Sequence, residues 1–276
     1  MRRTVPITLL ASLAASVLAP IPLSAAAPAP APAAAAAAPV PARNVVLVHG
    51  AWADGSSWSA VIPLLQAAGL HVTSVQNSLR TLAEADDDVR RALAAQDGPT
   101  VLVGHSWSGT VVSDVGTDPK VSALVYVAAR APAAGEDFLA LQHRFPDTPA
   151  RAGVVTQGAY TTLSEDAFVR FFANWLPARQ AKTLYAEQAP TAAALFTERT
   201  SATAWQVKPS FYAVSTRDMT ISPAFERFLA QRMHATTIAV KAGHLSMLSH
   251  PRAIADLILQ AAGVRRPGPP AGTPQS

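Results

Sequence analysis

Short, continuous runs of branched apolar residues recur along most of this 276-residue chain, and longer segments with helical spacing separate them. Runs that stay apolar, instead of alternating with polar residues, are typical of parallel strands covered on both faces. Together with the helical segments they predict an α/β fold with a doubly wound, mostly parallel sheet. The expected strands cover 44–50, 71–76, 99–105, 121–129, 209–216 and 235–241.

The expected helices lie between these runs. One of them starts with Thr81, followed three residues later by Glu84, which is the pattern of a capping box, and it ends at Gly98. Strands and helices thus alternate in the order that a parallel sheet requires. The remaining helices are expected over 56–69, 107–117, 223–232 and 251–262.

The alternation stops between residues 132 and 205. This part contains aromatic-rich segments with helical spacing, such as "FVRFFANWL" (168–176), and no recognisable strand. We therefore expect an α/β core made of 44–131 and 206–264, with a helical cap (132–205) inserted into it. Most of the cap aromatic residues are expected to fill the cap's own core, because the hydrophobic face of a helix explains their spacing.

Both ends of the chain differ from the rest in composition. Arg2 and Arg3 precede a short apolar run and a stretch of small residues, so 1–26 has the pattern of a secretory signal peptide. A membrane anchor is the alternative, but the run is shorter than the ~20 residues that a span needs. The Ala/Pro-rich spacer 27–43 and the tail 265–276 are expected to be disordered, because they cannot bury varied apolar surface.

This pattern predicts a secreted or periplasmic protein with no stable membrane anchor after signal removal. The formal net charge is only +4 and no basic stripe is visible, so nucleic acid is not an expected partner. The chain has no cysteine, which excludes disulfides and thiolate chemistry. It has no metal-ligand spacing and no glycine-rich dinucleotide loop, so we expect no metal and no organic cofactor.

One strand-like run leads directly into a polar turn, "VLVGHSWSG" at 101–109. A strand, a turn with Gly104 and Ser106, and a following helix are the context of a nucleophile elbow, a sharp turn that lifts one serine above the sheet. The usual second glycine, two residues after the nucleophile, is Ser108 here, with Gly109 next. The alternatives are a plain turn capped by Ser106, and Ser108 as the nucleophile, although Ser108 is expected inside the helix.

A nucleophilic serine needs a base, and the base needs an orienting carboxylate. Asp218 follows the strand at 209–216, and His244 follows the strand at 235–241. The chain order Ser106, Asp218, His244 is the order of one known triad arrangement, and all three residues follow the carboxyl ends of strands, where open α/β sheets bind ligands. The sequence therefore predicts a Ser–Asp–His triad.

Each partner has a simpler interpretation. Asp218 can be a turn aspartate, and His244 can be a loop histidine hydrogen-bonded to the backbone. His250 is the rival base, although "SHP" resembles a helix cap. His105 neighbours the serine, but its side chain is expected to point away from the apex of the turn.

The oxyanion of an acyl-transfer reaction needs two preorganised N–H donors. One is expected from the backbone of Trp107, directly after the serine. The other is expected from Ala51 in the loop "HGAWADGSSW" (49–58), where Gly50 permits a close backbone approach. An apolar substrate pocket is expected to include Trp52, Phe138, Phe172 and Trp175.

Four segments together resemble the α/β-hydrolase superfamily: "VVLVHGAWADGSSW", "VLVGHSWSG", "DMTISP" and "AGHLSMLSHP". They are similar to its small-esterase branch, which contains plant methylesterases, hydroxynitrile lyases and bacterial carboxylesterases. The resemblance implies an α/β-hydrolase fold with a helical cap. It also implies that Ser106 is the nucleophile, Asp218 the acid and His244 the base, with Ala51 and Trp107 forming the oxyanion hole.

Two positions distinguish the hydroxynitrile lyases of this family from this chain. Lyases of the family carry threonine where this chain has Gly50, and lysine where it has Leu245. A lyase needs positive charge to stabilise leaving cyanide, so Leu245 argues against this activity. Cofactor-free dioxygenases share the fold and a His–Asp pair, and they stay an alternative, as does a non-catalytic binding protein with a vestigial triad.

The sequence thus predicts a carboxylesterase-type serine hydrolase. It is expected to act on a small-molecule ester as substrate. We expect it to cleave carboxylic esters of small, largely apolar molecules through an acyl-enzyme.

Overall fold

The computed structural model describes residues 41–264. The expected signal peptide, spacer residues 27–40 and the expected tail lie outside the described residues. Within the expected spacer, Ala42 is buried and its backbone N–H donates to the carbonyl of Ala262 at 2.8 Å. The packed body therefore begins slightly before the end of the segment that composition marked as a spacer.

A six-stranded sheet with the order β2-β1-β3-β4-β8-β9 forms the centre of the described chain, and all of its pairings are parallel. The α/β prediction is thereby confirmed. The chain leaves β1 to form β2 on one side and then returns to form β3 on the other side. This change of direction opens a crevice at the carboxyl ends of β1 and β3, where such sheets bind ligands. The strands are β1 (Asn44–Val48), β2 (His71–Val75), β3 (Thr100–His105), β4 (Val121–Val127), β8 (Ser210–Ser215) and β9 (Thr236–Val240).

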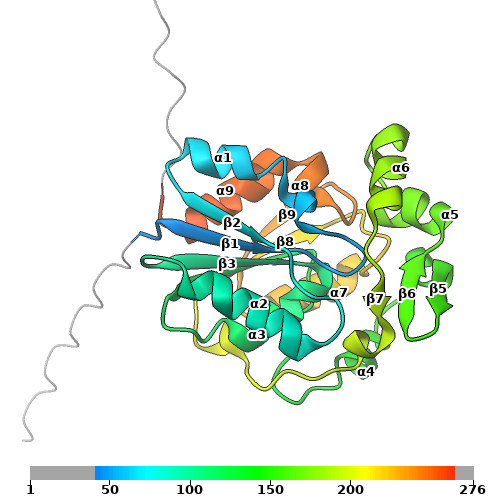
Figure 1. The fold of residues 1–276 in the computed structure, drawn as a ribbon, viewed down its shortest axis with the longest axis horizontal. Helices are drawn as coiled ribbons and strands as arrows, with labels where there is room; N and C mark the ends of the chain where they lie inside the picture. Colours follow the sequence, from blue (N-terminus) through cyan, green and yellow to red (C-terminus); the bar gives the residue numbers. More distant parts are fainter. Residues whose placement is uncertain (1–40, 265–276) are drawn as a thin grey trace, which may run out of the picture. The chain divides into compact units, whose positions relative to one another are not determined.

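Helices cover both faces of the sheet. Figure 1 shows α1 and α9 over one face and α2 and α3 over the other. Further along the chain, α7 packs against β8. The bounds are α1 (Ile62–Ala67), α2 (Leu82–Ala94), α3 (Gly109–Val115), α7 (Pro223–Arg232), α8 (Ser246–Ser249) and α9 (Pro251–Ala261).

Two helix predictions need correction. The segment expected as one helix over 56–69 is a short 3-10 helix, Gly55–Trp58, followed by α1. Pro63 lies in the first turn of α1, where it has no N–H to continue an earlier helix. In α2 the Thr81 hydroxyl accepts from the Glu84 amide at 3.2 Å, but the Glu84 carboxylate binds Ser78 and Arg80, so only half of the predicted capping box forms.

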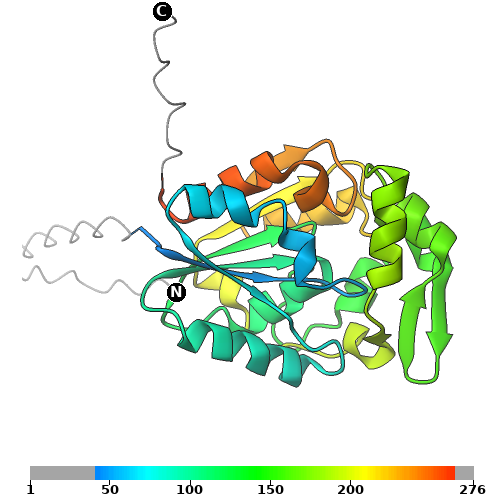
Figure 2. The same ribbon diagram turned by 45° about the horizontal axis from the view of Figure 1, so that its top comes forward.

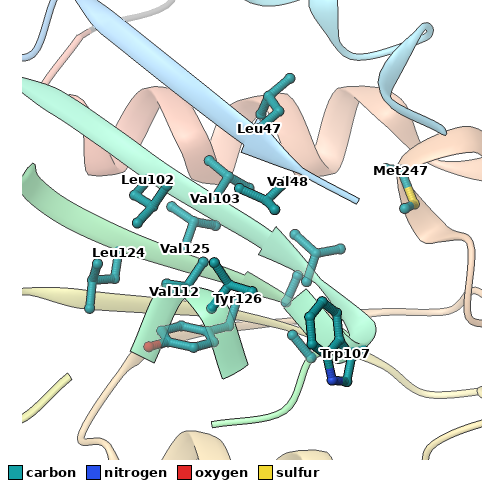
Figure 3. Packing of buried hydrophobic residues seen from close by; sticks show 14 of the residues in the cluster. Leu47, Val48, Leu102, Val103, Trp107, Val112, Leu124, Val125, Tyr126 and Met247 are labelled. Carbon is teal, nitrogen blue, oxygen red and sulfur yellow. The ribbon is translucent and has the colours of Figure 1, made fainter. Parts of the chain in front are cut away.

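The central strands pack their side chains in rows. Leu47, Val103 and Val125 are paired across β1, β3 and β4, and all three are fully buried. Figure 3 shows these side chains close together, with Trp107 following directly after the end of β3. The turn after β3 therefore stands on a densely packed and rigid base.

Residues 132–205 contain strands as well as helices, which contradicts the expectation that this part has none. Three short strands form an antiparallel sheet in the order β5-β6-β7. A turn with Gly158 at φ +61° joins the first two strands, which have only four residues each, so their alternation is too short to stand out. The elements are α4 (Phe138–Gln142), β5 (Val154–Gln157), β6 (Tyr160–Leu163), α5 (Glu165–Ala167), α6 (Ala178–Glu187) and β7 (Thr191–Ala192).

This insertion lies beyond the carboxyl ends of the central strands, as Figure 2 shows. The aromatic segment 168–176 is not one helix: its first part, Phe168–Phe172, is a π-helical turn that continues directly from α5, and Trp175 beyond it has φ +75°. Between residues 41 and 264, no helix combines the length and the apolarity that a membrane span needs.

Candidate active site

Ser106 occupies a strained turn at the end of β3. Its φ is +55°, in the left-handed region that non-glycine residues avoid. The turn is tight enough that a Cβ at Gly104 would lie 2.7 Å from Val112 Cγ2, and a Cβ at Gly109 would overlap the Arg130 carbonyl. The second glycine that the turn needs is therefore Gly109, which explains why serine is tolerated at position 108.

Ser106 and Ser108 have different surroundings. The Ser108 hydroxyl is fully buried, accepts from the His105 amide at 2.9 Å and donates to the Val48 carbonyl, 2.8 Å away. Ser108 therefore ties the turn to β1. Ser106 lines a cavity of about 230 Å³ instead, so only the Ser106 hydroxyl faces space that a ligand can enter.

The three residues of the predicted triad lie in hydrogen-bond contact. Ser106 Oγ is 2.8 Å from His244 Nε2, and His244 Nδ1 is 2.6 Å from Asp218 Oδ2. A carboxylate only accepts hydrogen bonds, so Nδ1 carries the proton and a neutral ring leaves Nε2 free to accept from the Ser106 hydroxyl. This is the arrangement that proton transfer from serine to histidine requires. The catalytic roles of the three residues stay a prediction.

Asp218 is both a turn aspartate and the partner of His244, and it uses a different carboxylate oxygen for each contact. Oδ1 accepts from the backbone amides of Thr220 at 2.6 Å and Ile221 at 2.9 Å, as a turn aspartate does. Oδ2 faces His244. The turn thereby fixes the orientation of the carboxylate that contacts the imidazole.

Two residues that the sequence did not assign hold the backbone of His244. His105 Nε2 lies 3.1 Å from the His244 carbonyl, so it carries the proton and donates. Burial lowers the pKa of His105 well below its usual range, and the ring is therefore neutral. Asn174, from the insertion, accepts from the His244 amide at 3.4 Å and donates to the Arg217 carbonyl at 2.8 Å, so it connects the loops of Asp218 and His244.

A buried glutamate on α7 supports Asp218 from behind. Glu226 Oε2 accepts from the Ser215 amide at 2.8 Å, and the Glu226 carboxyl lies close enough to Asp218 for the two charges to interact. Burial, and then the charge of Asp218, raise the pKa of Glu226 well above its usual range. Burial and the neighbouring Asp218 charge both disfavour ionisation, so the neutral form of Glu226 is favoured. Its Oε1 has no hydrogen-bond partner among the described residues, so no donor there stabilises the ionised form at that oxygen.

The cavity beside Ser106 also contains the two residues expected to bind an oxyanion. Ala51 and Trp107 both line it. The Trp107 indole donates to the Leu195 carbonyl at 3.1 Å, which connects the serine turn to the insertion. Gly50 has no room for a side chain, because a Cβ there would lie 2.7 Å from the Cβ of Ser106. The loop after β1 therefore passes directly beside the serine.

Only one of the four expected pocket residues lines this cavity, namely Trp52. Phe138 is buried beneath the Arg130 guanidinium, whose Cζ is 4.3 Å from the ring centroid. Phe172 is also buried and packs against the His244 ring at 5.1 Å between centroids. Trp175 is 47% exposed and lies beside His250. The sequence shows that these residues are aromatic, but it does not show their orientation. Packing between the insertion and the core decides which of them face the cavity.

A family profile described as the Alpha/beta hydrolase family matches residues 45–257. Salicylic acid-binding protein 2 from Nicotiana tabacum is 29% identical over 255 residues, which cover 80% of this chain and 97% of that protein. A carbendazim hydrolyzing esterase from Nocardioides sp. (strain SG-4G) is 32% identical over 112 residues. That match spans 36% of this chain and less than half, 46%, of the esterase.

Solved structures with the same fold include a pyrethroid hydrolase from Sphingobium faniae JZ-2. Its TM-score is 0.66 at 21% identity, and the match covers 80% of this chain and 98% of that one. The crystal structure of polyneuridine aldehyde esterase gives a TM-score of 0.68 at 18% identity, covering 79% of this chain and 98% of the other. These similarities are similarities of fold.

The neutral state of Glu226 predicts a pH-dependent stability difference. Because its pKa is higher in the folded than in the unfolded chain, its contribution to stability is complete below about pH 4 and is lost as the pH rises towards the folded pKa. The variant Glu226→Gln keeps an acceptor for the Ser215 amide, but its side-chain amide does not titrate. The Tm of Glu226→Gln, relative to wild type, should therefore increase steadily from pH 4 upwards in thermal melts.

Two variants serve as controls for this measurement. Asp86, buried on α2, has its pKa raised to about 8, first by burial and then by the Asp114 charge, so Asp86→Asn should show the same trend. Asp166→Asn, at an exposed ion pair with Arg170, alters no buried group and serves as the surface control. A Tm difference for Glu226→Gln that does not change with pH would contradict a neutral Glu226.

Proposed function

Because the chain belongs to the alpha/beta hydrolase family, we propose that it is a serine hydrolase that cleaves carboxylic esters through an acyl-enzyme. The observation that carries this proposal is the hydrogen-bonded series Asp218–His244–Ser106, which ends at the cavity. The names of the relatives support it: one is a carbendazim hydrolyzing esterase and another a pyrethroid hydrolase.

In the proposed mechanism, Ser106 Oγ attacks the ester carbonyl while His244 Nε2 takes the serine proton. Asp218 holds the ring in the required tautomer and stabilises the imidazolium that forms. The backbone N–H groups of Ala51 and Trp107 bind the oxyanion of the tetrahedral intermediate. His244 then protonates the leaving alkoxide. Water attacks the acyl-enzyme with His244 again as base and regenerates the Ser106 hydroxyl.

The size of the cavity restricts the substrate. A volume of about 230 Å³ suits a small molecule, and much of the lining is apolar, including Trp52, Phe196 and Ile221. The proposed substrates are therefore small carboxylic esters whose groups are largely apolar.

Two features of the site argue against cyanohydrin cleavage. The residue after His244 is Leu245, which is buried and provides no cation for a leaving cyanide. The family's lyases carry threonine at the place of Gly50, where even a single Cβ would lie 2.9 Å from the His105 carbonyl oxygen. A vestigial binding site is not favoured either, because the hydrogen bonds between serine, histidine and aspartate are all in place.

The proposed nucleophile is tested by replacing each serine of the turn. Ser106→Ala should lower kcat/KM for a small ester by at least about a thousandfold, because no acyl-enzyme can form. Ser108→Ala removes the bonds to Val48 and His105, so it should lower Tm but keep measurable turnover in the folded fraction. Turnover that survives in Ser106→Ala and vanishes in folded Ser108→Ala would assign the nucleophile to Ser108.

The competing activities of this fold are distinguished by direct comparison. We expect ester turnover to exceed both cyanohydrin cleavage and oxygen uptake, because the site has Leu245 after the histidine and a serine poised for attack. A pH-stat with short-chain esters, a cyanide assay and an oxygen electrode measure the three rates. Faster consumption of a cyanohydrin or of oxygen than of every ester would overturn the hydrolase proposal.

The proposal includes export from the cytoplasm. It rests on the charged start, the short apolar run and the small residues before Ala26. N-terminal sequencing of the protein from periplasm or medium should give a chain that begins near Ala26 or Ala27. Recovery of membrane-bound protein that still begins with Met1 would favour an anchor instead.

A further inference from the structure

Arg130 contacts the proposed nucleophile and also lines the cavity beside it. The residue follows the end of β4, and its backbone N–H donates to the Ser106 carbonyl at 2.9 Å. Its side chain is buried, with 5% of the residue exposed, and Arg130 lines the same cavity as Ser106. A cation is thus fixed within the proposed substrate site rather than at its rim.

The Arg130 guanidinium has few partners. Nη2 donates to the Phe196 carbonyl at 3.3 Å, and Cζ lies over the Phe138 ring. Nε has no hydrogen-bond partner among the described residues, and no carboxylate there pairs with the group. Burial lowers the pKa of Arg130 to about 10, so the side chain is still charged at neutral pH.

A buried charge without an opposite charge is expensive, and proteins normally pair it. The partly buried Arg232 follows this rule, because its Nη1 lies 2.8 Å from Glu136 Oε1. Arg130 does not follow it, although a guanidinium has five N–H donors to satisfy. The missing acceptors must therefore come from water or from a molecule that enters the cavity.

The lining of the cavity contains no acidic side chain among the described residues. Its only other charged member is Arg151, at the exposed rim, which pairs with Asp147 at 3.3 Å. The interior of the cavity therefore carries a net positive charge. A neutral ester leaves this charge uncompensated, whereas an ester with its own carboxylate neutralises it.

We propose that the Arg130 guanidinium is an anion subsite that binds a carboxylate of the substrate, so that the preferred esters are small acids such as half-esters of dicarboxylic acids. A planar guanidinium fork matches a carboxylate in geometry and charge. The rest of the substrate stays largely apolar, as the remaining lining requires. This inference rests on the proposed ester hydrolysis.

The test compares pairs of esters in which one member carries a carboxylate and the other a neutral group in its place. Monomethyl glutarate, compared with methyl pentanoate, has the carboxylate on the acyl side. 4-Acetoxybenzoate, compared with 4-acetoxybenzamide, has it on the alcohol side. Hydrolysis is followed with a pH-stat at neutral pH. In wild type, kcat/KM for the acid should exceed that for the neutral ester in at least one pair, by about 10- to 100-fold.

Variants assign that preference to one residue. Arg130→Met should lower the ratio of acid to neutral ester by about 10- to 100-fold, and Arg130→Lys, which keeps the charge without the fork, should lower it less. The matched control Arg151→Met removes a cavity arginine whose charge is exposed and already paired, so the ratio should change less than about threefold. Far-UV circular dichroism of each variant reports its folding.

A binding measurement keeps the subsite separate from the activity. Benzoate should raise the Tm of wild-type protein, its neutral counterpart benzamide should not, and Arg130→Met should lose the effect of benzoate. If no ester is hydrolysed but benzoate still stabilises through Arg130, the ester hydrolase proposal fails and the subsite stands. Ester hydrolysis without preference for either acid, or a preference that survives in Arg130→Met, overturns the subsite.

Discussion

The left-handed backbone of Ser106, at φ +55°, is the constraint on which the rest of the site depends. A non-glycine residue holds this conformation only when its surroundings overdetermine it. Here the carbonyl of Ser106 accepts from Arg130, and the next turn of chain is tied to β1 through Ser108. Gly50 and Gly109 pass so close that neither position has room for a Cβ. The serine is thus held by backbone contacts from neighbouring parallel strands.

The same sheet brings the other groups to the serine. Asp218 follows β8 and His244 follows β9, so their side chains reach the edge of the sheet at which Ser106 already lies. Two buried groups lie behind them: Glu226, next to Asp218, and His105, which donates to the His244 backbone. If Glu226 and His105 were ionised, each would place an uncompensated charge in the interior.

Much of this arrangement could be predicted from the sequence, because it depends on local patterns. Unbroken apolar runs indicated the parallel strands. Because Ser106, Asp218 and His244 each follow the end of a strand, the sequence also predicted that they lie close together. The support by Glu226 could not be predicted, because it depends on how α7 packs on β8. The same holds for Phe172, which packs against His244 instead of lining the cavity. It also holds for Arg130, because only the folded interior shows that its Nε has no hydrogen-bond partner among the described residues. The short hairpin around Gly158 escaped notice because its strands are too brief for periodicity.

The central claim is that the strained turn makes Ser106 the reactive hydroxyl of this protein. Labelling the folded protein with a fluorophosphonate and mapping the adduct by peptide mass spectrometry tests it most directly, because this needs no knowledge of the substrate. We expect one adduct, on Ser106, that disappears when His244 is replaced by Ala and the imidazole no longer contacts the hydroxyl. An adduct on Ser108, or no adduct on the folded wild-type protein, would contradict it.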